Sequence, residues 1–357
     1  MKRKREEDSV TGFKKIVKKR RRAKDKGLED EEPRPGSSKD PGTSSPYARL
    51  NISSFNIHQA LGRGGFGKVV LASVPGRNTY MAVKIITKKW DNEDVIKRER
   101  QILLAGRDCP FLCHLYAAQQ SQHHAYFIME YLSGGSLEAL LRMCGCLNID
   151  NVRFYAAEIV CGLQFLHGHN IVHRDIKPEN IMLDADGHIR IIDMGLAQDG
   201  ATDKIYGAVG TLHYMAPEVL LRQGYDAAVD WWSLGILIFR MAAGCPPFYN
   251  GPVRKMARTA IISEKPTFPP GLDADVSHLV RKLLRKNPKK RLGVRGNIRE
   301  HPFFTTIGWE ELEVRKARPP FTPFPSVLKE EHLQWPEHTR ALHPVADFNY
   351  VSPSWAW

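Results

Sequence analysis

The hydrophobic pattern of the chain changes from a period of two to a period of 3.6, and this change constrains the fold most strongly. From Phe55 onward, apolar runs of strand length are separated by glycines and predict an antiparallel sheet. The runs are Ile57 to Leu61, Val69 to Ser73, Tyr80 to Ile86 and Tyr126 to Tyr131. A sheet built from such short runs needs a second layer to bury its apolar face.

Helical periods supply that second layer. Asp94 to Leu104 predicts one helix between the strands, with Val95, Ile102 and Leu103 on its apolar side and Lys97, Arg98 and Glu99 around the rest. After Ser136 the spacing i, i+3, i+4, i+7 from Val152 to Leu166 predicts a long amphipathic helix with Asp150 as its N-cap. A strand-rich part followed by a helix-rich part predicts an α+β protein of two lobes with a cleft between them.

Composition narrows the class of protein. The 357 residues are 42% hydrophobic, enough for one large core or two lobes. The longest apolar run, Leu234 to Phe239, is far shorter than a membrane span, and the charged N-terminus predicts no secretory signal. The six cysteines lack the spacing of zinc sites. We therefore expect an intracellular protein with reduced thiols.

A glycine-rich segment lies where the first two strands meet. Gly62-Arg63-Gly64-Gly65-Phe66-Gly67 matches GxGxxG, and glycine lets backbone amides approach a phosphate closely. On its own the motif is weak, because it is also compatible with a plain turn, or with a dinucleotide site where a helix follows. Here strand residues follow. The next strand carries Ala82-Val83-Lys84, whose alternation directs the lysine toward the cleft, unless it is merely a solvated strand residue.

The most informative segments follow in order in the helical part. They are His173-Arg174-Asp175-Ile176-Lys177-Pro178-Glu179-Asn180, then Asp193-Met194-Gly195, then Ala216-Pro217-Glu218. Each alone is compatible with a core histidine or an ordinary turn. Together they supply what phosphoryl transfer needs, namely metal ligands, a base for a hydroxyl proton and cations for phosphates.

With these motifs in this order, the chain resembles the protein kinases from about residue 55 to residue 304. The resemblance implies a bilobal kinase fold, with a small antiparallel β-sheet lobe that contains one main helix and a larger, mainly helical lobe. It also implies transfer of the γ-phosphoryl of ATP, with Mg²⁺, to a hydroxyl of a protein substrate. Lys177, two residues after Asp175, is typical of serine/threonine kinases.

The resemblance assigns roles to ionic residues. It implies that Lys84 holds the α- and β-phosphates and pairs with a helical glutamate, for which Glu99 is the best match and Glu93 the alternative. Asp175 is the implied catalytic base, and Lys177 steadies the transferred phosphoryl group. The implied magnesium ligands are Asn180 and Asp193.

The resemblance also implies an ATP-binding set. Its members lie on the glycine loop, on the strands and at the hinge between the lobes, with Met129 as gatekeeper. They are Leu61, Gly62, Gly64, Gly67, Val69, Ala82, Lys84, Met129, Glu130, Leu132 and Met182.

Further segments point to a subgroup. Asp230-Trp231-Trp232-Ser233-Leu234-Gly235, Arg291-Leu292-Gly293 and His301-Pro302-Phe303-Phe304 are similar to the AGC group, and within it to the protein kinase C catalytic domain. Residues 305–357 are then a shortened AGC-type tail that ends with Phe348-Asn349-Tyr350-Val351. Because about 54 residues precede the kinase domain, we expect no cysteine-rich lipid-binding module and no diacylglycerol control.

The chain departs from the family at regulatory positions. Gly207 stands where an activating threonine is usual, and Asn349 replaces the phosphorylatable residue of the tail motif, where Val345 replaces an aromatic residue. We therefore expect activity that does not depend on the usual activation-loop threonine.

Two acidic positions that such kinases use for basic substrates are altered as well. Ser136 and Arg240 replace carboxylates, while Glu179 remains. Charge-assisted contacts with substrate arginines are therefore weakened, which leaves substrate preference open.

The positive charge is concentrated in the N-terminal segment, residues 1–54, which we predict to be disordered. Of a net charge of +13, residues 1–26 hold 13 lysines and arginines against 4 acidic residues. Lys2 to Arg5 and Lys14 to Arg22 form two basic clusters that resemble a bipartite nuclear localisation signal. An arm that binds a polyanion and a solvated tail without a partner are the alternatives.

Three functions stay in competition at this point. An active kinase is favoured because all six ionic residues are present, whereas pseudokinases usually lose one. A scaffold is the second hypothesis, motivated by the altered regulatory positions. A nucleic-acid-binding protein is the third, and it rests on the basic segment alone. We expect a monomer in the nucleus, the cytoplasm or both.

Overall fold

The computed structural model describes residues 51–64, 67–77, 79–200, 204–248, 254–323, 335, 344–353 and 355. Several sequence predictions concern residues outside these ranges. They include the disorder of the first 50 residues, the basic clusters, and Gly65 and Phe66 of the glycine loop.

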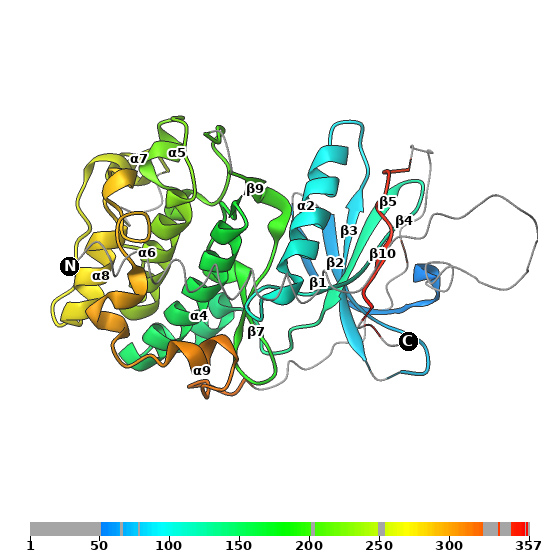
Figure 1. The fold of residues 1–357 in the computed structure, drawn as a ribbon, viewed down its shortest axis with the longest axis horizontal. Helices are drawn as coiled ribbons and strands as arrows, with labels where there is room; N and C mark the ends of the chain where they lie inside the picture. Colours follow the sequence, from blue (N-terminus) through cyan, green and yellow to red (C-terminus); the bar gives the residue numbers. More distant parts are fainter. Residues whose placement is uncertain are drawn as a thin grey trace, which may run out of the picture. The chain divides into compact units, whose positions relative to one another are not determined.

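The predicted antiparallel sheet is present, with two strands more than the sequence indicated. Its six strands follow the order β1-β2-β3-β5-β4-β10, and every neighbouring pair is antiparallel. The strands are β1 (Asn56–Gly64), β2 (Gly67–Ser73), β3 (Tyr80–Thr87), β4 (Leu115–Gln120), β5 (His124–Glu130) and β10 (Tyr350–Val351). The two that the runs did not predict are β4 and β10, and both lie at the same edge of the sheet (Figure 1).

Helix α2 (Glu93–Ala105) runs across one side of this sheet (Figure 1). The predicted helix is confirmed, but its buried side is rotated. Ile96 and Glu99 are buried together with Ile102 and Leu103, whereas Val95 is only half-buried. Glu99, which the pattern placed among the outward residues, is therefore drawn inward. A carboxylate buried to this extent requires a cationic partner.

The remaining elements form the helical part of the protein. Its helices are α3 (Leu137–Cys144), α4 (Ile149–Gly168), α5 (Pro217–Leu220), α6 (Ala228–Ala243), α7 (Arg254–Ser263), α8 (Ala274–Leu283) and α9 (Trp309–Glu313). Two small hairpins pair β6 (Ile171–Val172) with β9 (Gln198–Asp199) and β7 (Ile181–Leu183) with β8 (Ile189–Ile191). Short 3-10 turns that matter below are η4 (Pro178–Asn180), η5 (Met194–Leu196) and η6 (Leu212–Tyr214). The other 3-10 turns are η2 (Ile52–Ser54), η3 (Gly106–Asp108), η7 (Pro288–Lys290), η8 (Ile298–Glu300) and η9 (Pro302–Phe304).

The long amphipathic helix is α4, and its predicted N-cap was wrong. The cap is Asn148, whose side chain accepts a hydrogen bond from the backbone N–H of Asn151, while Asp150 already lies in the first turn. A carboxylate in the first turn still favours the helix through its dipole. The sheet together with these helices confirms the predicted α+β, bilobal class.

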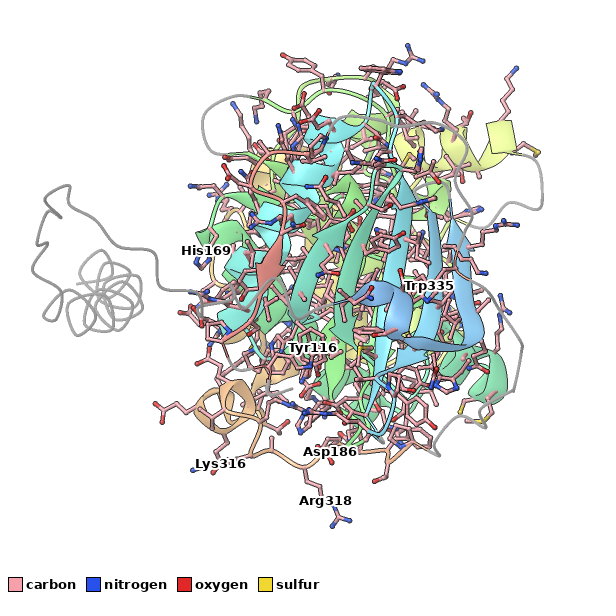
Figure 2. All side chains as sticks on the ribbon, turned by 90° about the vertical axis from the view of Figure 1, so that its right-hand side faces the viewer. Tyr116, His169, Asp186, Lys316, Arg318 and Trp335 are labelled. Carbon is pink, nitrogen blue, oxygen red and sulfur yellow. The ribbon has the colours of Figure 1, made fainter. Side chains whose placement is uncertain are left out.

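The core has two parts. The larger cluster lies among the helices and extends to α2 and β5, and a smaller one covers the outer face of the sheet. Tyr126 packs edge-on against Trp335, and Tyr116 stacks on Trp355. Figure 2 looks onto this face, with Tyr116 and Trp335 labelled. Residues near the chain's end therefore complete the outer layer of the small lobe.

The described tail residues are attached to the sheet and to α2. Phe348 is fully buried, with its ring centroid 5.4 Å from that of Phe127 on β5. Arg100 of α2 donates to the Phe348 carbonyl over 2.7 Å, and Gln120 exchanges two 2.7 Å hydrogen bonds with the Val345 backbone. The tail thus supports α2 from outside. In the described part of the chain, no helix is long and apolar enough to cross a bilayer.

Candidate active site

A buried carboxylate holds the loop that carries Asp175. Asp230, fully buried in α6, accepts hydrogen bonds from the backbone N–H groups of His173 and Arg174, both over 2.9 Å, and lies 2.8 Å from His167 Nε2. Burial alone would raise the pKa of Asp230, but the hydrogen bond and charge of His167 hold it below its ordinary value. A helix in the core therefore fixes the backbone that precedes Asp175.

The Asp175 carboxylate lies in a network with three side chains. Thr211 donates to Asp175 Oδ1 through both its backbone N–H and its hydroxyl, each over 3.0 Å. Lys177 Nζ lies 2.7 Å from Asp175 Oδ2 and donates to the Thr211 hydroxyl over 2.9 Å. Asn180 donates from Nδ2 to the Asp175 carbonyl and, over 3.1 Å, to Oδ2. The predicted base, cation and amide are therefore brought together.

Lys84 of β3 joins the sheet to the helical part. Its Nζ lies 2.6 Å from Glu99 Oε1 on α2 and 2.8 Å from Asp193 Oδ1. The predicted partner Glu99 is thus the glutamate in contact, while the alternative, Glu93, pairs with Lys97. Gly195 permits this convergence, because a Cβ there would come within 3.2 to 3.5 Å of all three charged side chains.

Electrostatics keep two members of this triad, Lys84 and Asp193, ionised. Burial would lower the pKa of Lys84, but the charges of Glu99 and Asp193 outweigh it and raise that pKa above its ordinary value. Burial likewise opposes ionisation of Asp193, yet Lys84 lowers its pKa. Burial raises the pKa of Glu99, against the attraction of Lys84. We expect the Lys84 cation and the Asp193 anion to persist across the neutral pH range.

The ligands predicted for magnesium have suitable chemistry. Because Asn180 donates through Nδ2, its amide oxygen stays available, and Asp193 presents a carboxylate whose side chain is 37% exposed. Oxygen ligands of this kind suit Mg²⁺, which usually takes one or two protein oxygens together with phosphates and water. No group of three His, Cys, Asp or Glu side chains among the described residues could hold a metal alone. The two side chains therefore fit a metal whose shell a nucleotide completes.

The predicted ATP-binding residues of the strands share one face of the sheet. Val69 lies opposite Lys84, and Ala82 lies opposite Met129, so the alternation of β-strands directs these four side chains to the same side. The residues of opposite parity, such as Val70 and Val83, belong to the outer core. Leu61 on β1, which also belongs to the predicted ATP-binding set, is 38% exposed.

The glycine loop is open where a phosphate would need space. A Cβ at Gly62 or Gly64 would meet nothing within 4 Å. At Gly67, by contrast, φ is +147° and a Cβ would lie 2.1 Å from the Ile85 carbonyl oxygen. Gly67 therefore seats β2 against β3, and Gly62 and Gly64 leave the backbone of β1 accessible.

The predicted hinge residues do not place a charged side chain in the site. The Glu130 carboxylate turns away to Arg190, 3.0 Å from its Nε, and accepts from the His114 N–H over 2.8 Å. Leu132 is buried, and Met182 is half-buried and bridged to Ser136. The side chain of Glu130 is thus not brought into the site with Lys84 and Asp175.

The segment around Gly207 is held by hydrogen bonds that involve Arg174, Tyr225 and Ile205. Arg174 donates from Nε to the Leu196 carbonyl over 2.6 Å and from Nη1 to the Tyr225 hydroxyl over 3.2 Å. The same hydroxyl donates to the Gly207 carbonyl over 3.0 Å. Ile205 and Tyr225 exchange two backbone hydrogen bonds of 2.9 Å. A tyrosine hydroxyl therefore links Arg174 to this segment.

Three residues of this site were not predicted to belong to it. Asp230 lies within a quoted motif and Thr211 does not, and their side chains contact or anchor the Asp175 loop. Tyr225 lay in no motif. The signal for Thr211 was its position after Gly210, where a Cβ would come 2.6 Å from the Arg174 carbonyl oxygen and so prevent this close approach.

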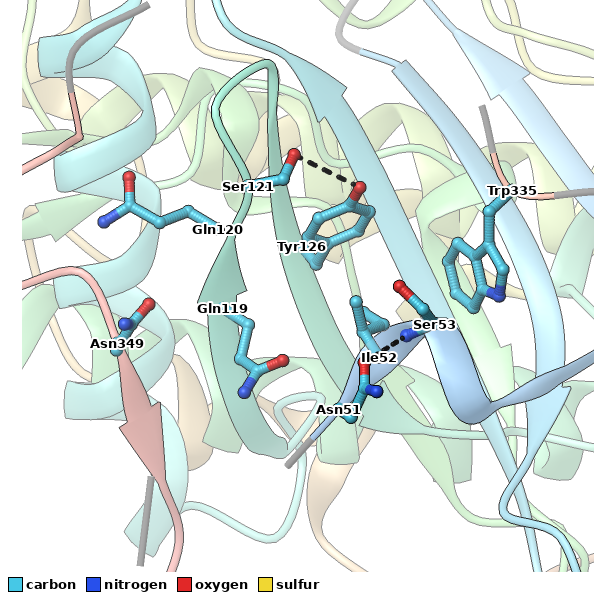
Figure 3. Close-up of a pocket in the computed structure, with 9 residues that line it drawn as sticks. All are labelled: Asn51, Ile52, Ser53, Gln119, Gln120, Ser121, Tyr126, Trp335 and Asn349. Carbon is cyan, nitrogen blue, oxygen red and sulfur yellow. Dashed lines mark hydrogen bonds between the residues drawn. The ribbon is translucent and has the colours of Figure 1, made fainter. Parts of the chain in front are cut away.

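A cavity of about 310 Å³ lies elsewhere, at the outer face of the sheet (Figure 3). It is lined by uncharged residues, among them Asn51, Gln119, Ser121, Tyr126 and Trp335. None of the predicted site residues lines it. The cavity is therefore separate from the residues of the Lys84 and Asp175 networks.

Comparison with known proteins agrees with this geometry. The family described as "Protein kinase domain" matches residues 55–304, and the chain belongs to the protein kinase family. It is 40% identical over 281 residues to protein kinase C delta type of Rattus norvegicus, covering 77% of this chain and 42% of that protein. Protein kinase C-like 1 of Caenorhabditis elegans is 36% identical over 293 residues, covering 79% and 42%. The serine/threonine-protein kinase YPK1 of Saccharomyces cerevisiae is 39% identical over 284 residues, covering 77% and 41%.

These matches confirm the predicted resemblance to the protein kinase C catalytic domain. The chain spans about two fifths of the length of these relatives. The similarity therefore concerns their catalytic part.

Proposed function

We propose that the chain is an active serine/threonine protein kinase that transfers the γ-phosphoryl group of ATP, with Mg²⁺, to hydroxyls of protein substrates. The observation that carries this proposal is the Lys84–Glu99–Asp193 triad, formed with contacts of 2.6 and 2.8 Å beside the Asp175–Lys177–Thr211 network. The three relatives named above are all protein kinases by name. One is named a protein kinase C type and one protein kinase C-like.

The residues divide the work of phosphoryl transfer. Asp175 orients the substrate hydroxyl and accepts its proton, and Thr211 holds that carboxylate through two hydrogen bonds. Lys177, next to Asp175 Oδ2, stabilises negative charge on the transferred group. Lys84 binds nucleotide phosphates, and its contact with Glu99 keeps the ammonium in place.

Asn180 and Asp193 would hold the magnesium ion through the amide oxygen and the carboxylate. A bound magnesium ion neutralises phosphate charge and orients the phosphates for in-line transfer. The open backbone at Gly62 and Gly64 would cover the phosphates, and the face with Val69, Ala82 and Met129 would receive the adenine.

The kinase we propose needs no phosphate at the usual activation-loop position. Gly207 cannot be phosphorylated, and the Arg174 guanidinium already binds the Leu196 carbonyl and the Tyr225 hydroxyl. The bridge between Ile205 and Tyr225 and the ion pair of Lys204 with Asp226 add further support to the segment. These contacts supply the order that a phosphorylated threonine would otherwise provide.

The test is transfer of labelled phosphate from Mg-ATP to a mixed library of Ser/Thr peptides. The protein is produced in bacteria, treated with a phosphatase and purified without an activating kinase, with Asp193→Asn as the control. We expect transfer by the wild type that the variant loses. Absence of transfer by folded, ATP-binding wild-type protein would instead favour the scaffold.

We also propose that the basic segment within residues 1–26, outside the described residues, directs the protein to the nucleus. Its two clusters of lysine and arginine support this proposal. Deletion of residues 1–26 should move a tagged protein out of the nucleus. An unchanged distribution, combined with salt-sensitive binding of nucleic acid that the deletion abolishes, would favour the polyanion-binding arm instead.

A further inference from the structure

A partly buried ion pair contacts Tyr214, which lies close in sequence to Thr211 of the Asp175 network. Tyr214 follows Thr211 by three residues in η6, and Glu179 follows Asp175 by four in η4. A protein substrate that places its hydroxyl at Asp175 must cover these neighbouring turns with the residues on either side of the acceptor. The charges near Tyr214 therefore decide which substrate side chains are accepted.

The pair consists of a buried carboxylate and an arginine from another helix. Glu138, in the first turn of α3, is only 8% exposed, and its Oε2 lies 2.6 Å from Nη2 of Arg240 in the last turn of α6. Arg240 also donates from Nη1 to the Tyr214 hydroxyl over 2.8 Å. Burial would lower the pKa of Arg240, but Tyr214 and Glu138 raise it, so the guanidinium stays charged.

A second guanidinium uses the same carboxylate. Arg142, one turn after Glu138 on α3, donates from Nε to Glu138 Oε1 over 2.9 Å. Its side chain is 77% exposed, and that of Arg240 is 21% exposed, so both present part of a cation to solvent. One carboxylate thus faces two guanidinium groups, which leaves a surplus of positive charge at this spot.

The other candidates for binding a basic substrate are limited. The Ser136 hydroxyl is uncharged and caps α3 by accepting from the Ala139 N–H over 3.1 Å. Glu179 is exposed and acts electrostatically on Tyr214, so it lies near the pair. The formal charges of Glu179, Glu138, Arg142 and Arg240 add up to zero. No net negative charge is therefore left there to attract a basic side chain.

We propose that Arg240, from within the protein, engages the Glu138 carboxylate that a basic side chain of a substrate would otherwise engage. This inference rests on the proposed kinase function and names its substrate class. The kinase then rejects arginine and lysine at the residue that contacts the Glu138–Arg240 pair, and accepts an uncharged or acidic side chain there. A substrate arginine would meet two guanidinium groups whose shared carboxylate is already occupied.

The test is a peptide series on an alanine-rich scaffold with one Ser acceptor. Each of the positions flanking the acceptor carries Arg, Gln or Glu in turn, and kcat/KM is measured for wild type, Arg240→Gln and Arg240→Glu. One position should respond to residue 240. There the wild type should disfavour Arg, and Arg240→Glu should favour Arg over Gln by about tenfold or more. Arg240→Gln should shift the preference in the same direction by less.

A charge-swapped variant provides the matched control. In Glu138→Arg/Arg240→Glu the pair is kept with its signs exchanged, whereas Arg240→Glu alone leaves two carboxylates against Arg142. We expect the swapped protein to show no preference for arginine, and thermal unfolding of all variants to separate selectivity from misfolding. The proposal is overturned if the wild type prefers arginine at every responding position, or if Arg240→Glu and Arg240→Gln leave the whole profile unchanged.

Binding of the same peptides separates this inference from the proposed activity. Fluorescence anisotropy of labelled peptides, with a non-hydrolysable ATP analogue present, needs no phosphate transfer. Weaker binding of the Arg peptide to wild type, reversed in Arg240→Glu, would support the inference even if no transfer occurred. Equal binding of the Arg and Glu peptides to both proteins would overturn it while leaving transfer a separate result.

Discussion

The two sides of the Asp175 loop use their charged residues in opposite ways. On the Lys84 side, the charges converge on a place that remains partly open, since the Asp193 side chain is 37% exposed and the Asn180 amide oxygen stays available. On the Arg240 side, the charges satisfy one another, with Glu138 held between two guanidinium groups. Both sides contain close ion pairs, but only on the Lys84 side does the paired carboxylate, that of Asp193, remain substantially exposed, whereas the Glu138 side chain is 11% exposed and engaged by two cations.

The difference teaches how to interpret a close ion pair near an active site. A buried pair contributes little net stability by itself, because desolvation offsets much of the attraction. Its placement matters more than its strength. The Lys84 pair fixes a cation where phosphates would bind, and the Arg240 pair removes a carboxylate from recognition.

The largest expected effect comes from a substitution within the Lys84 network. Asp193→Asn removes a carboxylate from the predicted metal site while it keeps the side-chain shape. We expect phosphate transfer to fall by roughly a thousandfold or more, because positioned charge supplies most of the rate in phosphoryl transfer. Single-turnover transfer to the best library peptide measures it. Asp199→Asn, an exposed carboxylate on β9, is the control and should stay near wild type, and a similar loss there would discredit the assignment.

The next effect tests whether the tail supports the same side. Phe348→Ala removes a ring that packs on Phe127 and loosens the segment whose carbonyl binds Arg100 of α2. We expect a loss of about 2–4 kcal/mol in unfolding free energy, and reduced transfer because α2 carries Glu99. Urea unfolding and the rate of transfer are measured together. The neighbouring exposed Asn349→Ala is the control, and wild-type stability of Phe348→Ala would contradict the packing argument.

The Lys84 side could be predicted from the sequence because its residues lie in motifs of fixed order. The lysine, the aspartates and the asparagine were each predicted by number, and the structure brings them together. The strand β4 was not predicted, because its central residues Ala117, Ala118 and Gln119 lack the β-branched alternation of the other strands. The two-residue strand β10 pairs across more than 200 residues of sequence, which no local pattern encodes.

The Arg240 side could not be predicted, although Ser136 and Arg240 were noted as departures. A substitution shows that a charge has changed, but its new partner depends on packing between α3 and α6. The same holds for Tyr225, whose hydroxyl contacts Gly207 and whose backbone pairs with Ile205, two contacts that depend on the tertiary fold. Residues that act through tertiary contacts carry no signature in sequence spacing.

A smaller effect tests the segment that borders the Arg240 side. Tyr225→Phe keeps the buried ring but removes the hydroxyl that joins Arg174 to the Gly207 carbonyl. We expect kcat to fall by about tenfold, because the loss of these hydrogen bonds should raise the activation free energy by roughly 1.4 kcal/mol. Tyr206→Phe, on the same segment but 69% exposed, is the control. Equal activity of the two variants would remove Tyr225 from the explanation of phosphate-independent activity.

The smallest expected effect concerns the stability of the fold. It involves two histidines that belong to neither of the two charged networks. His301 lies 2.8 Å from His278, and burial together with the charge of His278 lowers the pKa of His301 to about 4. Asp275 opposes this shift, and Lys282 adds to it. Because the folded-state pKa is below the ordinary value, the neutral histidine stabilises the fold above pH 6.5. That contribution is lost as the pH falls from 6.5 toward 4.

His301→Gln should therefore reduce, by about 1 kcal/mol, the loss of unfolding free energy that occurs as the pH falls from 7.5 to 5. This is less than the full pKa shift would give, because the pair lies near the surface. Urea unfolding at pH 7.5, 6 and 5 measures it, and His169→Gln, an exposed histidine, is the control (Figure 2). If His301→Gln keeps the wild-type slope, the acid sensitivity in this pH range comes from other groups. His213, whose pKa is also lowered by burial and by the charge of Arg240, would be the next to substitute.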